Sequence, residues 1–200
     1  MPKDNKGPIN FQDLMLHRIH EILLVASPYD AFILEEDGRL TQQILYEYLG
    51  MNLSYAPRVW HAKNAKTGLQ MLAERSYDLV IVMMRISDMD PITFGEKVKK
   101  NFPDKPVILL AFDESEITTL PQKRLNKSID RVYIWSGNAN VFPAIIKNIE
   151  DSMNLERDQK IADIRSIVMV EDNPRYYSII LPLIYRTCLL YTSPSPRDQR

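Results

Sequence analysis

Short runs of apolar residues alternate along this chain with segments whose apolar residues recur every three or four positions. The short runs predict strands and the recurring pattern predicts helices. Strands are expected at 21–26, 59–62, 79–84, 106–111 and 131–135. Helices are expected at 40–49, 66–75, 91–101, 114–125 and 142–153, the fourth interrupted by Pro121. Strand and helix therefore alternate five times.

Three of the predicted strands are apolar at almost every position rather than at every second one. Strands that are buried on both faces of a parallel sheet have this pattern. Together with the alternation, it predicts an α/β fold, a doubly wound five-stranded parallel sheet of the flavodoxin-like type. Functional groups of such sheets gather at the carboxyl ends of the strands. Those ends are Ala26-Ser27, Met83, Ala111 and Trp135.

One strand and the loop after it, residues 77–91, carry a family resemblance. The sequence Tyr-Asp-Leu-Val-Ile-Val-Met-Met-Arg-Ile-Ser-Asp-Met-Asp-Pro resembles the central strand and loop of the receiver domain of two-component response regulators. In that family the strand ends in an aspartate that accepts a phosphoryl group, and a turn similar to Pro-Asp-Met-Asp-Gly follows. The turn is present here, but the acceptor position is Met83.

The resemblance implies a set of chemical groups that this chain lacks. Receivers hold a divalent cation, normally Mg²⁺, with an acidic pair after the first strand and with the acceptor. A hydroxyl after the fourth strand and a lysine after the fifth bind the phosphoryl oxygens. The acidic-pair positions are Ala26 and Ser27, the hydroxyl position is Ala111 and the lysine position is Trp135. A thioether at Met83 is neither a nucleophile for phosphoryl transfer nor a ligand for a hard cation. The first domain is therefore expected to have no catalytic residue and no cofactor.

Two uses of an apolar group at the lysine position remain open. Trp135 either fills the former cation pocket together with Met83 and Ala111, or it is an exposed anchor for a partner protein. Acidic residues near the first strand are expected to form a solvated turn within an insertion; they are Asp30, Glu35, Glu36 and Asp37. Asp88 and Asp90 are expected to form the turn after the third strand.

A second strand-and-turn signal follows a charged stretch. Residues 166–174, Ser-Ile-Val-Met-Val-Glu-Asp-Asn-Pro, resemble the first strand of a receiver and its acidic pair. A helix kinked at Pro182 is expected next. The resemblance implies that Glu171 and Asp172 bind Mg²⁺ in an intact second receiver domain.

These patterns divide the chain into five parts. We expect a leader at 1–18, a phosphorylation-incompetent receiver-like domain at 19–153, a linker at 154–165 and the start of a second receiver at 166–187. Residues 188–200 resemble the translation of a sequencing adapter, and we expect them to be foreign to the protein; a genuine Ser/Pro linker is the alternative.

Composition narrows the classes of function. Apolar residues make up 45% of the 200 residues and charged residues 26%, and the net charge is −1. This balance predicts neither nucleic-acid nor membrane binding and favours a cytoplasmic protein. No glycine-rich loop follows any predicted strand, which argues against a dinucleotide or flavin enzyme.

The expected function is that of a non-catalytic receiver module in phosphorelay signalling. The first domain would be a pseudo-receiver that acts in protein interaction or as a homodimer, and the second would be the phosphorylated switch. Partners would be a histidine kinase or an output domain. Two alternatives remain open: the regulatory N-terminal segment of a phosphoenolpyruvate-synthase-like phosphotransferase, and a flavodoxin-like module that binds a small molecule.

Overall fold

Five parallel strands form the centre of the structure, a computed structural model that describes residues 14–35, 40–51, 53, 55–162 and 166–192. Their order is β2-β1-β3-β4-β5. They are β1 (Glu21–Val25), β2 (Arg58–Ala62), β3 (Leu79–Met83), β4 (Val107–Ala111) and β5 (Arg131–Ile134). The predicted flavodoxin-like sheet is confirmed, and its order reverses between β1 and β3, where such folds place their sites.

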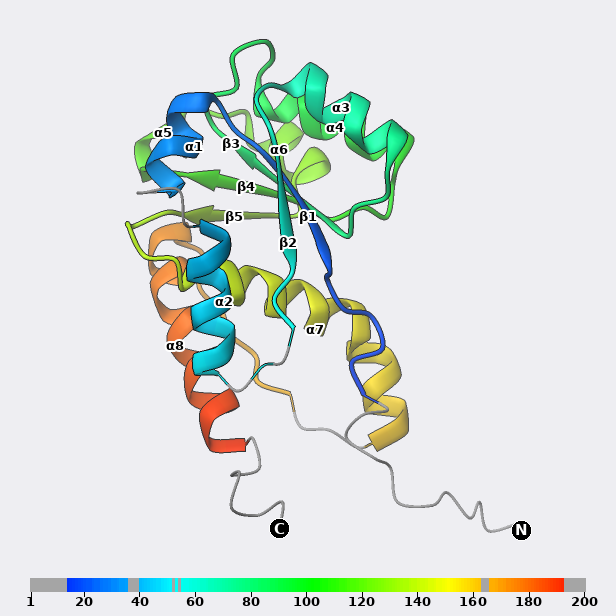
Figure 1. The fold of residues 1–200 in the computed structure, drawn as a ribbon, viewed down its shortest axis with the longest axis vertical. Coiled ribbons are helices and arrows are strands. Elements are labelled where there is room, and N and C mark those ends of the chain that lie inside the picture. Colours follow the sequence, from blue (N-terminus) through cyan, green and yellow to red (C-terminus); the bar gives the residue numbers. More distant parts are fainter. Residues whose placement is uncertain (1–13, 36–39, 52, 54, 163–165, 193–200) are drawn as a thin grey trace, which may run out of the picture.

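Helices cover both faces of the sheet (Figure 1). Within the described residues they are α1 (Pro28–Glu35), α2 (Leu40–Gly50), α3 (Ala65–Glu74), α4 (Pro91–Asn101), α5 (Glu114–Thr118), α6 (Gln122–Ser128), α7 (Val141–Ala162) and α8 (Pro174–Thr192). Residues of α2 and α7 pack on one face, and residues of α3, α4 and α6 pack on the other. Helix α8 lies beside α7 and against β5.

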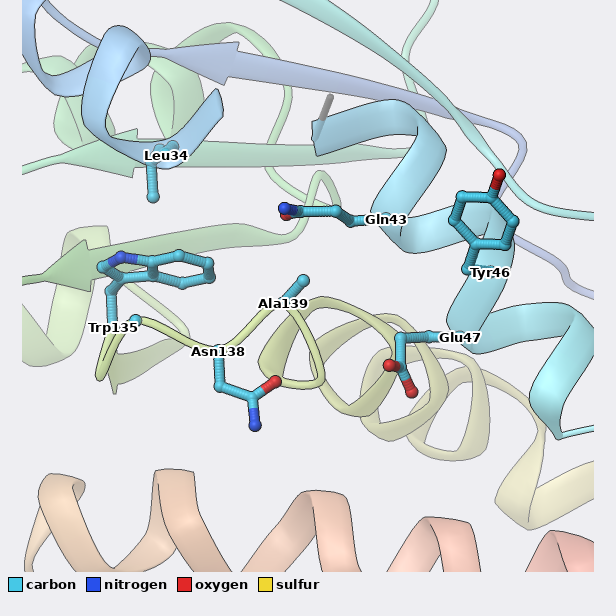
Figure 2. A pocket seen from close by; sticks show the side chains of 8 residues that line it. Leu34, Gln43, Tyr46, Glu47, Trp135, Asn138 and Ala139 are labelled. Carbon is cyan, nitrogen blue, oxygen red and sulfur yellow. The ribbon is translucent and has the colours of Figure 1, made fainter. Parts of the chain in front are cut away.

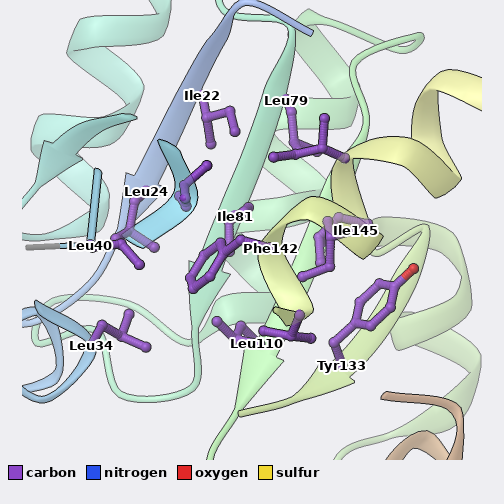
Figure 3. Packing of buried hydrophobic residues seen from close by; sticks show 14 of the residues in the cluster. Ile22, Leu24, Leu34, Leu40, Leu79, Ile81, Leu110, Tyr133, Phe142 and Ile145 are labelled. Carbon is purple, nitrogen blue, oxygen red and sulfur yellow. The ribbon is translucent and has the colours of Figure 1, made fainter. Parts of the chain in front are cut away.

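The continuous apolar strands supply both halves of the core. Every residue of β3 and β4 is buried. Because successive side chains of a strand point to opposite faces, Leu79, Ile81 and Met83 join the α2/α7 side, and Val80 and Val82 join the α3/α4 side. Figure 3 shows the first cluster, in which Phe142 and Ile145 of α7 lie against the strands.

Two helices differ from the sequence-based prediction. The expected helix at 114–125 is divided into α5 and α6, with Pro121 at the start of α6. Proline has no backbone N–H and disfavours helical backbone in the preceding residue, so one continuous helix is not formed. Helix α1 takes the place of the first part of the predicted acidic turn, and Ser27 caps its start. The Ser27 hydroxyl accepts a hydrogen bond from the Asp30 backbone N–H at 3.0 Å.

Helix α7 continues to Ala162, through most of the segment that its charges predicted as a linker. Three of its polar side chains, spaced four residues apart, are buried: Glu150, Asn154 and Asp158. They accept hydrogen bonds from alternate backbone N–H groups of the chain before β1. The donors are Ile19 to Glu150 at 2.9 Å, His17 to Asn154 at 2.8 Å and Met15 to Asp158 at 2.9 Å. Residues 14–18, expected to be a leader, are thus bound along α7.

These hydrogen bonds fit because of two matching repeats. Four residues of a helix advance about 6 Å, and two residues of an extended chain advance about 6.6 Å. The chain departs from extended backbone at Met15, where φ is 56°. The Asn154 amide also donates to the His17 carbonyl at 2.7 Å. The three side chains therefore pair with backbone groups much as a neighbouring strand would, and we call this set the α7 ladder.

Helix α8 covers the outer edge of β5. The buried Ser178 hydroxyl accepts a hydrogen bond from the Ile134 backbone N–H at 2.8 Å, and the rings of Tyr133 and Tyr177 lie 5.7 Å apart. An edge strand has unpaired backbone groups that invite aggregation, and covering it with a helix removes that risk. Residues 166–170, for which the resemblance implies a strand in an intact second receiver, form no strand here, and Ile167, Val168 and Val170 are exposed.

Helix α8 also crosses the predicted boundary of the foreign tail, because it runs through Cys188 to Thr192. Residues 193–200 lie outside the described part of the chain.

Candidate functional site

The carboxyl ends of β1, β3, β4 and β5 lie side by side, as the parallel sheet requires. Val25 pairs with Val82, Met83 with Leu110, and Ala111 with Ile134. Ala26, Met83 and Ala111 each have a relative exposure of 0%. The structure therefore brings the predicted site positions together, but it buries apolar groups there.

Trp135 fills space at the end of β5. It is 8% exposed, and its ring lies 5.7 Å from that of Phe142 at an interplanar angle of 57°. Of the two uses left open by the sequence, the structure supports filling of the pocket. A cavity of about 290 Å³ remains beside the indole, and Figure 2 shows Leu34, Gln43 and Ala139 around it.

Asp88 and Asp90 cap helices, in keeping with their predicted structural role. Asp90 accepts a hydrogen bond from the Thr93 N–H at the start of α4, at 2.9 Å. Asp88 accepts from the backbone N–H groups of Ala65 and Lys66 at the start of α3, at 2.8 and 2.9 Å. Burial alone would raise the pKa of Asp88, but these hydrogen bonds outweigh it and hold the pKa below its ordinary value.

An ion pair joins the loop after β3 to the segment after β4, and sequence reasoning missed it. The Arg85 guanidinium lies 2.9 Å from the Glu116 carboxylate. The other Glu116 oxygen accepts a hydrogen bond from the Phe112 backbone N–H at 3.0 Å. Both residues are polar and lie in loop or short-helix sequence, so only the sheet register places them together.

The prediction of a solvated acidic turn is wrong for Asp30, which is buried. It lies in the first turn of α1, and its residue is only 1% exposed. Neither carboxylate oxygen has a hydrogen-bond partner. Of the other acids predicted in that turn, Glu36 and Asp37 lie outside the described residues.

Glu171 and Asp172 lie in the segment that leads into α8. They line a shallow cavity of about 240 Å³ together with Arg131 and Tyr177. Glu171 accepts a hydrogen bond from the Asn173 backbone N–H at 2.9 Å, which shapes the turn before α8. Their role in Mg²⁺ binding within an intact second domain stays a prediction.

The donor set at the carboxyl edge does not fit the Mg²⁺ of receivers. Ala26 and Met83 offer no oxygen ligand at two of the three expected positions. Within the described residues, no group of three or more His, Cys, Asp or Glu side chains could hold a metal ion.

Comparison with solved structures identifies the fold as that of receiver domains. The chain is similar to the signal receiver domain of an HD domain-containing protein from Pseudomonas fluorescens Pf-5, with 25% identity over 78% of this chain and 98% of that chain and a TM-score of 0.52. A CheY-like response regulator receiver domain from Methanospirillum hungatei JF-1 shares 19% identity, over 68% of this chain and 98% of that chain, with a TM-score of 0.51.

A third similar structure is the receiver domain of AraT, a response regulator from Geobacillus stearothermophilus. It shares 14% identity over 68% of this chain and 98% of that chain, with a TM-score of 0.51. No family model matches the sequence, and no curated protein matches it either. Among the described helices, none combines the length and the apolar character needed to cross a membrane.

Proposed function

We propose that this chain is a pseudo-receiver, a receiver-fold module that takes part in two-component signalling by protein interaction without accepting a phosphoryl group. The observation that carries the proposal is Met83, fully buried at the end of β3 where receivers keep the acceptor aspartate. Ala26, Ala111 and Trp135 support it, because each replaces a charged or polar group of the reaction with an apolar one.

A phosphorylation assay tests the proposal directly. We expect no gain of mass when the chain is incubated with acetyl phosphate and Mg²⁺. An acyl phosphate located within residues 19–153 would overturn the proposal.

Restoring the missing groups provides the matched control. Met83→Asp alone is expected to stay unreactive, because no cation would neutralise the charge of the phosphoryl group. The combination of Ala26→Asp, Ser27→Asp, Met83→Asp, Ala111→Thr and Trp135→Lys should gain Mg²⁺ binding and phosphorylation. Reaction of the single variant would show that the other four positions do not limit the chemistry.

An interaction module needs accessible apolar side chains, and α1 and α2 both carry them. Tyr29, Phe32, Leu45, Tyr46 and Leu49 are exposed there, with Phe32 at 73%. We propose that a second copy of the chain binds these side chains, since α8 already covers the edge of β5. Sedimentation should show a dimer that Phe32→Ser weakens, whereas Tyr176→Ser on α8 should leave it unchanged. A monomer at every concentration would exclude self-association.

The tandem arrangement is a further part of the proposal. In a longer protein, residues 166–174 would form the first strand of a second receiver, and Glu171 with Asp172 would hold its Mg²⁺. Glu171→Ala should then weaken Mg²⁺ binding in the full-length protein. Recovery of the complete gene would separate this arrangement from a regulatory segment of a phosphoenolpyruvate-synthase-like enzyme.

A further inference from the structure

Asp30 is the buried acid in the described chain whose carboxylate oxygens have no partner. Glu150 and Asp158, which are buried to a similar degree, each accept a backbone hydrogen bond and each contact a cation. At Asp30 the backbone N–H is bonded to Ser27, but both side-chain oxygens lack any bond. An ionised carboxylate in that state has lost its hydration without gaining hydrogen bonds in exchange, which is strongly unfavourable. A neutral carboxylic acid avoids most of that cost.

The charged groups around Asp30 do not offer a salt bridge in its place. Arg85, from the loop after β3, lowers the pKa of Asp30, and Glu116, from α5, raises it. These two residues are paired with each other at 2.9 Å, so their charges largely cancel. Burial is the largest influence and raises the pKa of the carboxyl above its ordinary value. The nearby Ser27 side chain acts against it and lowers the pKa, but its hydroxyl makes no hydrogen bond to either carboxylate oxygen and the effect of burial prevails.

We propose that Asp30 is held as a neutral acid and that helix α1 docks on the carboxyl edge of the sheet only while this proton is bound. Asp30 and Leu34 lie one helical turn apart on the buried side of α1. Leu34 lines the cavity beside Trp135 (Figure 2). Loss of the proton therefore favours hydration of Asp30, release of α1 and exposure of the indole.

The sign of the pH dependence follows from the raised pKa. A carboxyl whose pKa is higher in the folded than in the unfolded state binds more protons when folded. Its contribution to stability is greatest below the unfolded value, near 3.8, and falls as the pH rises through the folded value.

The test compares the chain with Asp30→Asn, which is nearly isosteric and neutral at every pH. Urea unfolding between about pH 4 and pH 8 should show wild-type stability falling relative to the variant as the pH rises. In a Trp60→Phe background, Trp135 is the remaining tryptophan, and its emission should shift to the red over the same pH range. Asp30→Asn should abolish the shift.

Asp88→Asn is the matched control, because Asp88 has a lowered pKa. Its contribution to stability is present above the unfolded value and is lost as the pH falls, so the variant should change the slope in the opposite direction. A carbon chemical-shift titration that places the pKa of Asp30 at or below the ordinary value would overturn the proposal. Saturable stabilisation by Mg²⁺ that Asp30→Asn abolishes would also overturn it, by making the partner a metal cation.

Discussion

The burial of Met83 agrees with what its sequence context predicts, whereas the burial of Asp30 does not. The segment at 77–91 carries enough of a receiver pattern to assign Met83 to the acceptor position, and its burial follows from the apolar strand that contains it. Asp30 is followed by three further acids at 35–37, and this acidic stretch predicts a solvated turn. Its burial depends on Ser27 starting a helix that turns one face to the sheet edge, which local composition does not encode.

The environment of Met83 predicts the effect of introducing the acid alone. Met83→Asp should lower the free energy of unfolding by about 3–5 kcal/mol near neutral pH, because it creates an unpaired buried charge. The loss should be smaller in acid, because burial raises the pKa of the new carboxyl and the group is then neutral. The variant's stability should fall as the pH rises through that raised pKa. Met83→Leu should cost less than about 1.5 kcal/mol. Equal costs in urea unfolding would show that the position tolerates charge.

Element boundaries were harder to predict than the elements themselves. The strands and the apolar parts of the helices follow their periodicity closely, because those residues make the core. The end of α7 was missed because Asn154 and Asp158 have the character of linker residues, while their role is to bind the backbone of the chain before β1. Helix α8 was predicted, but the cover it provides for β5 depends on contacts distant in sequence.

The packing of α8 against the sheet predicts different effects for substitutions at two leucines of this helix. Leu181 is 4% exposed and packs with the main core, and Leu183 on the same helix is 61% exposed. Leu181→Ala should therefore lower the free energy of unfolding by about 2–5 kcal/mol. Leu183→Ala should change it by no more than about 0.5 kcal/mol. Similar small effects of both variants in urea unfolding would mean that α8 does not contribute to the stability of the sheet.

The five-stranded sheet could be predicted because the pattern of an apolar strand followed by a helix repeats five times along the chain. The position of residues 166–192 could not, since an isolated strand-and-helix signal fits either a new domain or an addition to the existing one. In the structure, Leu181 and Tyr177 of this segment join the core that contains Trp135. One connected core implies one cooperative unit.

Unfolding measurements test whether the sheet and α8 unfold together as one cooperative unit. Tryptophan fluorescence, which reports on Trp60 and Trp135 in the sheet region, and far-ultraviolet circular dichroism, to which α8 contributes strongly, should give one coincident urea transition. Separate midpoints, with helix content lost first, would show that α8 unfolds independently of the sheet.

The α7 ladder also determines how the domain responds to force on its N-terminal end. The chain before β1 runs antiparallel to α7, since Met15 binds Asp158 and Ile19 binds Glu150. Force applied to the N-terminal end loads the Met15 hydrogen bond first, then the His17 bonds and then the Ile19 bond. The bonds of the α7 ladder would therefore break one after another and not all at once. The α7 ladder would thus be loaded before β1. Force transmitted by a protein attached to the N-terminal end would break these hydrogen bonds before it acts on the strands of the sheet.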